Sequence, residues 1–260
     1  MARLGERDRV ILQSLADFRL LTGRQLQQLH VDSSNPGTAA RRTRAVMRRL
    51  SELRVVVRLD RRVGGIHAGS EGYVYSLSGL GYAVLALDGH ETHRGRTIWE
   101  TKPAFQDHVL AIAELFVELH GLQRSGEVEL LDFEPEPRAW RTFSGPAGQA
   151  LPVKPDAFVA VAVGEYEQRA FVEVDLGTES LPTIRRKCRR YLDYWRSGSE
   201  QQRHGVFPRV WWLAATERRL RRLAEVVAEH RADEQPLFAV ALAPHGPRLL
   251  AGLPLPGGTA

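Results

Sequence analysis

The chain has 260 residues, of which 43% are hydrophobic and 26% are charged, and this globular composition excludes collagen-like, low-complexity and wholly disordered proteins. Its one cysteine, Cys188, excludes a disulfide framework and a zinc site built from cysteines. The amino terminus is charged, unlike a signal peptide, and the clean apolar runs reach only about seven residues. We therefore expect a soluble, cytoplasmic protein that makes no use of a membrane.

The charge of the chain is distributed unevenly along its length. Residues 1–62 hold 14 basic and 6 acidic side chains, whereas residues 101–260 hold 20 basic and 21 acidic ones. A local excess of positive charge is the electrostatic footprint of a module that binds a polyanion. The amino-terminal quarter is therefore the part that we expect to bind nucleic acid.

Residues 1–88 predict a winged helix-turn-helix domain. Apolar side chains at helical spacing and capping residues at Thr22, Thr38 and Ser78 set the expected helices, and a glycine-rich loop separates two strands. In chain order we expect helices over residues 7–20, 23–30 and 38–53, strands over 55–63 and 73–77 around a loop at 64–72, and a short helix over 79–87. Three helices followed by a hairpin is the order typical of this domain.

The third expected helix carries a run of arginines on the face opposite its apolar residues. A slim, basic helix fits the major groove of double-stranded DNA, and the hairpin wing can touch the adjacent backbone. The DNA-binding residues that we expect are Arg41, Arg42, Arg44, Arg48 and Arg49 on the helix, with Arg61, Arg62 and His67 on the wing. Two alternatives stay open: a solvated basic helix without a ligand, and a winged helix that mediates protein contacts or dimerisation.

Residues 89–102 lack a clear period and are polar, so they are the expected linker to a second domain at 103–245, with a tail at 246–260. The second domain alternates apolar runs and amphipathic stretches. We expect helices over 103–124, 181–198 and 216–230, and strands over 127–137, 153–164, 168–176, 208–215 and 236–242. This order predicts a mixed sheet covered by helices on both faces, and an α/β (α+β) chain as a whole.

Three carboxylates are expected to meet on one hairpin of this domain. Glu173 and Asp175 share a face of one strand, because strand side chains alternate. A turn centred between Glu165 and Tyr166 places Asp156 of the preceding strand opposite Asp175. Crowded carboxylates are costly unless a cation joins them, and oxygen ligands suit Mg²⁺ or Mn²⁺. The expected metal ligands are therefore Asp156, Glu173 and Asp175; a solvated hairpin is the alternative.

The pattern of Pro155-Asp156 followed by Glu173-Val174-Asp175 resembles the PD-(D/E)XK nuclease superfamily, which has the restriction-endonuclease-like fold. The resemblance implies that Asp156 and Glu173 hold a divalent metal for catalysis. Asp175 stands where the superfamily has its lysine. Lys187 on the following helix is the candidate substitute, so the implied catalytic residues are Asp156, Glu173, Asp175 and Lys187.

Most of the chain, roughly residues 8–245, resembles the replication-relaxation family. The segments that carry the resemblance are RDRVILQSLADFRLLTGRQL, RRTRAVMRRLSELRVVVRL, YSLSGLGYAVL, PDAFV, FVEVDLGTES and KCRRYLDYW. It implies DNA binding in plasmid or integrative-element replication or conjugative mobilisation, alongside other replication or conjugation proteins. Three functions remain open: a metal-dependent nickase or endonuclease, a non-catalytic DNA-binding accessory whose second domain is an inactive scaffold that forms a homodimer, and a protein-interaction adaptor.

Overall fold

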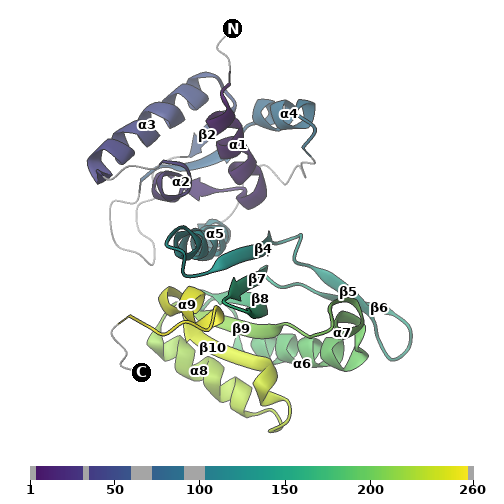
Figure 1. The fold of residues 1–260 in the computed structure, drawn as a ribbon. Helices are drawn as coiled ribbons and strands as arrows, with labels where there is room; N and C mark the ends of the chain where they lie inside the picture. Colours follow the sequence, from purple (N-terminus) through teal and green to yellow (C-terminus); the bar gives the residue numbers. More distant parts are fainter. Residues whose placement is uncertain (1–3, 32–34, 60–71, 91–102, 257–260) are drawn as a thin grey trace. The chain divides into compact units, whose positions relative to one another are not determined.

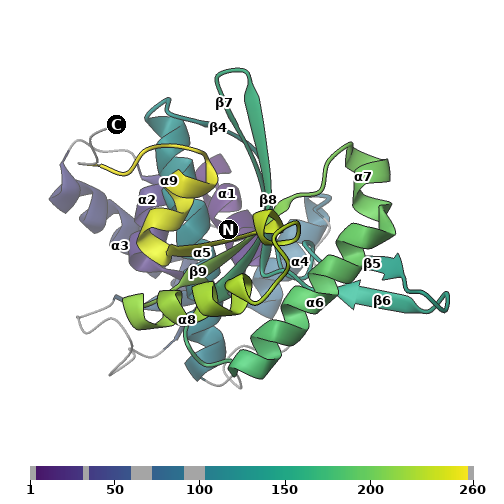
Figure 2. The same ribbon diagram turned by 90° about the horizontal axis from the view of Figure 1, so that it is seen from below.

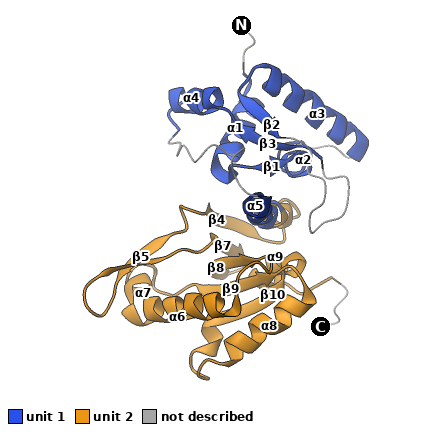
Figure 3. Cartoon of the chain, turned by 180° about the vertical axis from the view of Figure 1, so that it is seen from behind, with its two compact units in different colours: residues 1–117 blue, residues 118–260 orange. Residues whose placement is uncertain are grey.

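The structure is a computed structural model that describes residues 4–31, 35–59, 72–90 and 103–256. The chain is α+β, as expected, and divides into two compact units, Met1–Val117 and Glu118–Ala260 (Figure 3). The division lies within helix α5 (Pro103–Arg124), whereas the sequence places a linker at 89–102. Residues 91–102 of that expected linker lie outside the described residues. Each unit is described by itself below.

Unit 1 consists of helices around a small antiparallel sheet with strand order β1-β3-β2 (Figure 1). Its elements are α1 (Glu6–Phe18), β1 (Leu21–Thr22), α2 (Gly23–His30), α3 (Pro36–Glu52), β2 (Val56–Leu59), β3 (Val74–Leu77) and α4 (Gly79–Leu87). The order of three helices and then two paired strands is the one that the sequence predicts. The loop between β2 and β3 falls at residues 60–71, which the structure does not describe.

Side-chain caps explain where the helices of unit 1 begin. The Thr22 hydroxyl accepts a hydrogen bond from the backbone N–H of Gln25, whose side chain in turn accepts from Thr22 N, so the expected cap of α2 is confirmed. Ser78 caps α4 as expected. The expected cap of α3 at Thr38 is wrong: Asn35 is the cap, because its side chain accepts from the Thr38 N–H and the helix starts at Pro36.

The backbone of α4 lies against Val55, in the connection between α3 and β2 of unit 1. Gly81, in the first turn of α4, is buried, and a Cβ built there would overlap the carbonyl oxygen of Val55 and approach Leu77 Cδ2 to 2.9 Å. Ser78 N donates to the same Val55 oxygen at 3.1 Å. Only glycine permits this approach, so a single residue fixes the packing of α4.

Unit 2 is built on a mixed five-stranded sheet with strand order β10-β9-β8-β7-β4. Strands β4, β7 and β8 are antiparallel neighbours, and β8, β9 and β10 are parallel. Its elements after α5 are β4 (Glu129–Pro135), β5 (Arg141–Ser144), β6 (Ala150–Val153), β7 (Ala157–Val163), β8 (Tyr166–Asp175), α6 (Leu181–Ser197), α7 (Ser199–His204), β9 (Arg209–Ala214), α8 (Glu217–Ala228), β10 (Phe238–Leu242) and α9 (Gly246–Leu250).

Helices α6 and α8 contact each other and cover one face of this sheet (Figure 2). The core between these helices and the sheet includes Phe171 of β8, Trp212 of β9, and Cys188 and Tyr191 of α6, all buried. The start of the expected tail is also part of the unit, since Leu250 of α9 is buried. The mixed sheet predicted from the sequence is therefore present, and part of the expected tail packs onto it.

The hairpin of β7 and β8 corrects the expected register. Val163 pairs with Tyr166, so the turn consists of Gly164 and Glu165, and Gly164 has the positive φ of 59° that tight hairpin turns require. The expected turn lay one residue later. Ala157 pairs with Val172, which brings Asp156 beside Glu173 and two residues away from the partner that the sequence predicted. The carboxylate that meets Asp156 is therefore Glu173.

Candidate nucleic-acid interface and carboxylate site

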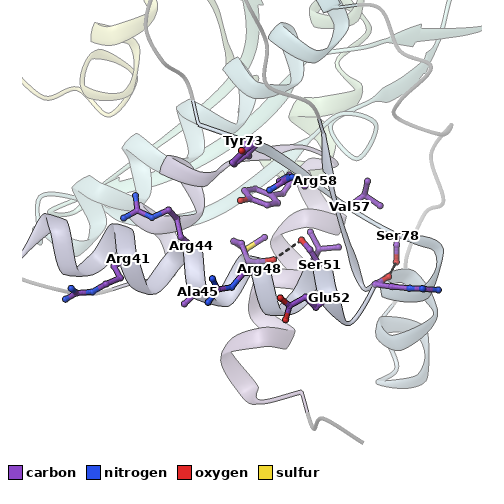
Figure 4. Close-up of a pocket in the computed structure, with 14 residues that line it drawn as sticks. Arg41, Arg44, Ala45, Arg48, Ser51, Glu52, Val57, Arg58, Tyr73 and Ser78 are labelled. Carbon is purple, nitrogen blue, oxygen red and sulfur yellow. Dashed lines mark hydrogen bonds between the residues drawn. The ribbon is translucent and has the colours of Figure 1, made fainter.

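A pocket of about 920 Å³ lies between α3 and strands β2 and β3 in unit 1, and we call it the basic groove (Figure 4). Among the described residues that line it, five are arginines and one is an acid, Glu52. The arginines are Arg41, Arg44 and Arg48 of α3, Arg54 after it, and Arg58 of β2; Tyr73 and Tyr75 belong to the strand side. The groove therefore combines a strong positive charge with two aromatic rings.

The structure separates the arginines that the sequence groups together on α3. Arg41, Arg44 and Arg48 recur at helical spacing, so they project along one side of the helix into the basic groove. All three are exposed, and none of them forms an ion pair with any described residue. Arg42 is also exposed but does not line the groove. Among the described residues these three guanidinium groups have no carboxylate partner, and their exposure leaves them accessible to an anionic ligand.

Arg49 has a structural partner instead. Its guanidinium forms an ion pair with the buried carboxylate of Asp8 in α1. The other oxygen of Asp8 accepts the backbone N–H of Gly5 at 2.8 Å and so closes the start of α1. The structure thus places Arg49 between α1 and α3, whereas the sequence predicts it among the DNA-binding residues. The expected wing residues Arg61, Arg62 and His67 lie outside the described residues.

Sequence reasoning missed the strand side of the basic groove. The Arg58 guanidinium carbon lies 4.2 Å from the centre of the Tyr73 ring, and Arg58 pairs across the strands with Tyr75. Burial raises the pKa of Tyr75, and the Arg58 charge acts in the opposite direction. The one available signal was the period of two along β2, which puts Arg58 and Val56 on the same side.

A second candidate site lies in unit 2, where Asp156 precedes β7 and Glu173 lies on β8. Both carboxylates are nearly inaccessible, with 7% and 1% of the residue exposed. Asp156 Oδ2 accepts the backbone N–H of Val174 at 2.7 Å, and this bond fixes the side chain against the neighbouring strand. The corrected register thus brings together two of the three carboxylates that the sequence singles out.

Glu173 is held by two side chains from helix α6. Lys187 Nζ lies 2.8 Å from one of its oxygens, and the Tyr191 hydroxyl donates to the other at 2.7 Å. Burial raises the pKa of Glu173 to about 7, the Asp156 charge adds to the rise, and Lys187 and Tyr191 oppose it. Lys187 also pairs with Glu179 at 3.0 Å. Burial alone would lower the pKa of Lys187, but these carboxylates outweigh it and raise the pKa.

The third carboxylate, Asp175, interacts with residues outside this cluster. Arg219 of α8 donates to both of its oxygens, at 2.8 and 2.7 Å, and the Gly177 N–H donates at 2.6 Å. The side chains of Asp156, Glu173 and Asp175 therefore do not form the single group that the sequence predicts. Throughout the described part of the chain, no group of three or more His, Cys, Asp or Glu is arranged to hold a metal ion. Arg219 is 44 residues away from Asp175, so no sequence spacing predicted the pair.

The fold and these two sites define an α+β protein with a basic helix–sheet groove in one unit and a buried carboxylate–lysine cluster in the other. The family model of replication-relaxation proteins matches residues 12–210, and the chain belongs to this family. The matched span contains the basic groove and the cluster of Asp156, Glu173 and Lys187. Family membership suggests a role in the replication or mobilisation of plasmids or related elements. Comparison with the curated proteins and with the solved structures gave no match.

Among the described residues, no helix is both long enough and apolar enough to cross a membrane.

Proposed function

We propose that this protein binds DNA through unit 1, as part of plasmid or integrative-element replication or mobilisation, and that the basic groove is the contact surface. The observation that carries the proposal is the set of exposed arginines Arg41, Arg44 and Arg48 on one side of α3, none of which forms an ion pair with a described residue. The order α1-β1-α2-α3-β2-β3 supports a winged helix-turn-helix, in which the third helix contacts the duplex.

The arginines give the proposal a measurable signature. Each guanidinium that neutralises a phosphate releases condensed counterions, so log K falls with log salt by about 0.9 per contact on duplex DNA. An arginine already paired within the protein, such as Arg49, contributes less because its charge is satisfied. The salt slope therefore reports how many groove arginines reach phosphates.

We expect the variant Arg44→Ala/Arg48→Ala to bind duplex DNA more weakly and to lower the salt slope by about two units, one for each lost phosphate contact. Fluorescence anisotropy with a labelled duplex at several salt concentrations measures both quantities. Arg7→Ala is the matched control, because Arg7 is exposed on α1 and does not line the groove. An unchanged affinity and slope in the folded double variant would reject the groove as the DNA contact.

A second candidate function, metal-dependent nicking of DNA, is supported by the cluster of Asp156, Glu173 and Lys187 in unit 2. Mg²⁺ is commonly held by one or two carboxylates together with substrate phosphates, and the adjacent pair of Asp156 and Glu173 suits that pattern. A metal site with all three carboxylates does not fit the structure, because the carboxylate of Asp175 is already paired with Arg219. Lys187 of α6 places its ammonium group beside Glu173. It would thereby supply the positive charge that a lysine at position 175 supplies in the nuclease pattern.

In this candidate function, Asp156 and Glu173 would hold the cation and Lys187 would keep a positive charge beside the phosphate. When bound, Mg²⁺ or Mn²⁺ lowers the pKa of a water and stabilises charge on the phosphate. The Val174 N–H orients Asp156, and Tyr191 together with Lys187 orients Glu173. The sheet and α6 therefore position all three side chains without help from a ligand.

Supercoiled plasmid incubated with the protein and Mg²⁺ or Mn²⁺ tests this candidate. If it is right, wild type nicks the plasmid, Asp156→Ala and Lys187→Ala abolish nicking, and the control Asp193→Asn, an exposed acid on α6, leaves it unchanged. Absence of cleavage, together with absence of calorimetric Mn²⁺ binding that depends on Asp156, would favour a non-catalytic DNA-binding accessory. Unit 2 would then be a scaffold, and the oligomeric state would be the next measurement.

A further inference from the structure

The basic groove contains a feature that contact with a fully paired duplex leaves unused. Tyr73 lies at the start of β3 with 44% of its surface exposed, and the planar guanidinium of Arg58 lies over its ring, 4.2 Å from the ring centre to the guanidinium carbon. Together they form a cation–π pair on the strand side, which we call the Arg58–Tyr73 platform. The arginines Arg41, Arg44 and Arg48 line the helix side of the same groove (Figure 4).

The chemistry of the platform points to the face of a nucleobase. In a paired duplex the base faces are covered by their neighbours, and only the base edges and the backbone reach a protein. An aromatic ring or a guanidinium plane gains most from a base that has left the stack, which it can cover face to face. Positive charge that follows the backbone, together with aromatic stacking, is the usual combination in proteins that hold single-stranded nucleic acid.

The size of the groove agrees with such a ligand. Its volume of about 920 Å³ lies within the range of about 300–1,000 Å³ typical of pockets that enclose small molecules, which includes a nucleotide. A convex helix is enough to read a duplex edge, whereas a concavity of this size between a helix and a sheet has room for an extruded residue. The arginines on the opposite wall are in a position to hold the phosphates on either side of it.

We propose that the basic groove binds unpaired DNA, with one base stacked on the Arg58–Tyr73 platform and its flanking phosphates on the arginines of α3. The proposal rests on the DNA-binding function proposed above and specifies its substrate as duplex DNA with a locally melted segment. Replication and mobilisation both require DNA strands to separate, and such a groove would hold the separated strand.

The test compares three labelled DNAs by fluorescence anisotropy: a fully paired duplex, the same duplex with a short mismatched bubble, and the bubble with abasic sites in place of the unpaired bases. We expect wild type to bind the bubble more tightly than the duplex and to lose that preference with the abasic DNA. Tyr73→Ala should weaken bubble binding by about 5- to 150-fold, the range that corresponds to one stacked base, while duplex binding changes little. Tyr73→Phe keeps the ring and should retain the preference.

A second readout reports stacking directly. A 2-aminopurine at an unpaired position should lose fluorescence on binding wild type or Tyr73→Phe, and keep it on binding Tyr73→Ala. Equal affinity of wild type for the bubble and the duplex, or an equal loss for both DNAs in Tyr73→Ala, would overturn the platform while leaving DNA binding intact. Failure of wild type to bind any of the three DNAs would instead overturn the proposed function itself.

Discussion

The buried carboxylate of Glu173 makes the stability of unit 2 depend on pH in a predictable direction. Burial and the neighbouring Asp156 raise the pKa of Glu173 from 4.5 to about 7. The folded state therefore holds its proton more tightly than the unfolded chain does. The resulting stabilisation is complete below about pH 4.5 and is lost as the pH rises through about 7.

The size of the effect follows from the shift. Each pKa unit corresponds to about 1.4 kcal/mol, so the free energy of unfolding should fall by up to about 3 kcal/mol between pH 5 and pH 8 because of this one group. Glu173→Gln removes the titration and keeps an oxygen that can accept the Tyr191 hydroxyl. Since Lys187 then loses one of its two carboxylate partners, we expect a net gain of roughly 1–3 kcal/mol at pH 8 and little change at pH 5.

Urea denaturation in the presence of EDTA, followed by tryptophan fluorescence, measures this difference at pH 5, 6, 7 and 8. Trp140, Trp195, Trp211 and Trp212 all lie in unit 2, and Trp212 is beside Lys187, so the signal reports mainly the unfolding of unit 2. Glu225→Gln is the control, because Glu225 is exposed on α8 and should leave the pH profile unchanged. A wild-type profile parallel to that of Glu173→Gln would refute the reasoning, because it would mean that Glu173 is ionised throughout the range.

Two further predictions concern packing. Arg219→Ala should destabilise unit 2 by about 3–5 kcal/mol in the same urea assay, because it leaves the buried Asp175 charge without its partner, and Asp175→Asn/Arg219→Ala should recover part of the loss. If the single and double variants are equally unstable, the ion pair is not the cause. Gly81→Ala should abolish the cooperative unfolding of unit 1 measured by circular dichroism, because the new Cβ would overlap the carbonyl oxygen of Val55. The control Gly89→Ala has open space around it and should cost only about 1 kcal/mol, for its positive φ. Cooperative unfolding of Gly81→Ala would contradict the packing of α4.

Much of the element order was predictable because capping residues and the periodicity of apolar residues are local features of the sequence. Thr22 and Ser78 stand directly before their helices, with a hydroxyl that can accept a backbone N–H of the first turn, and the apolar runs of β7 and β8 predict buried strands. The cap of α3 was missed because the side chains of Asn35 and Thr38 can both accept a backbone N–H, and the helix starts at Pro36, directly after Asn35. Local chemistry therefore predicts that a helix exists more reliably than it predicts where the helix starts.

The candidate sites show where sequence reasoning stops. The sequence singled out Asp156, Glu173 and Lys187, and the fold does place them together. It also grouped Asp175 with them, because an error of one residue in the turn moves every cross-strand partner by two positions. The partner of Asp175, Arg219, comes from a distant helix. Such contacts depend on how strands and helices pack in space, so they cannot be predicted from the spacing of residues along the chain.

The single cysteine has a practical consequence for measuring motion in this molecule. Cys188 lies on the buried face of α6, and burial raises the pKa of its thiol to about 12, with Glu173 adding to the rise. A maleimide dye at neutral pH needs an accessible thiolate and will therefore pass over the native thiol. Cysteines introduced by Arg42→Cys and Glu165→Cys, at two exposed positions in different units, would each take a dye without any need to replace Cys188. Energy transfer between the two dyes would then follow the separation of the units in solution as DNA is added.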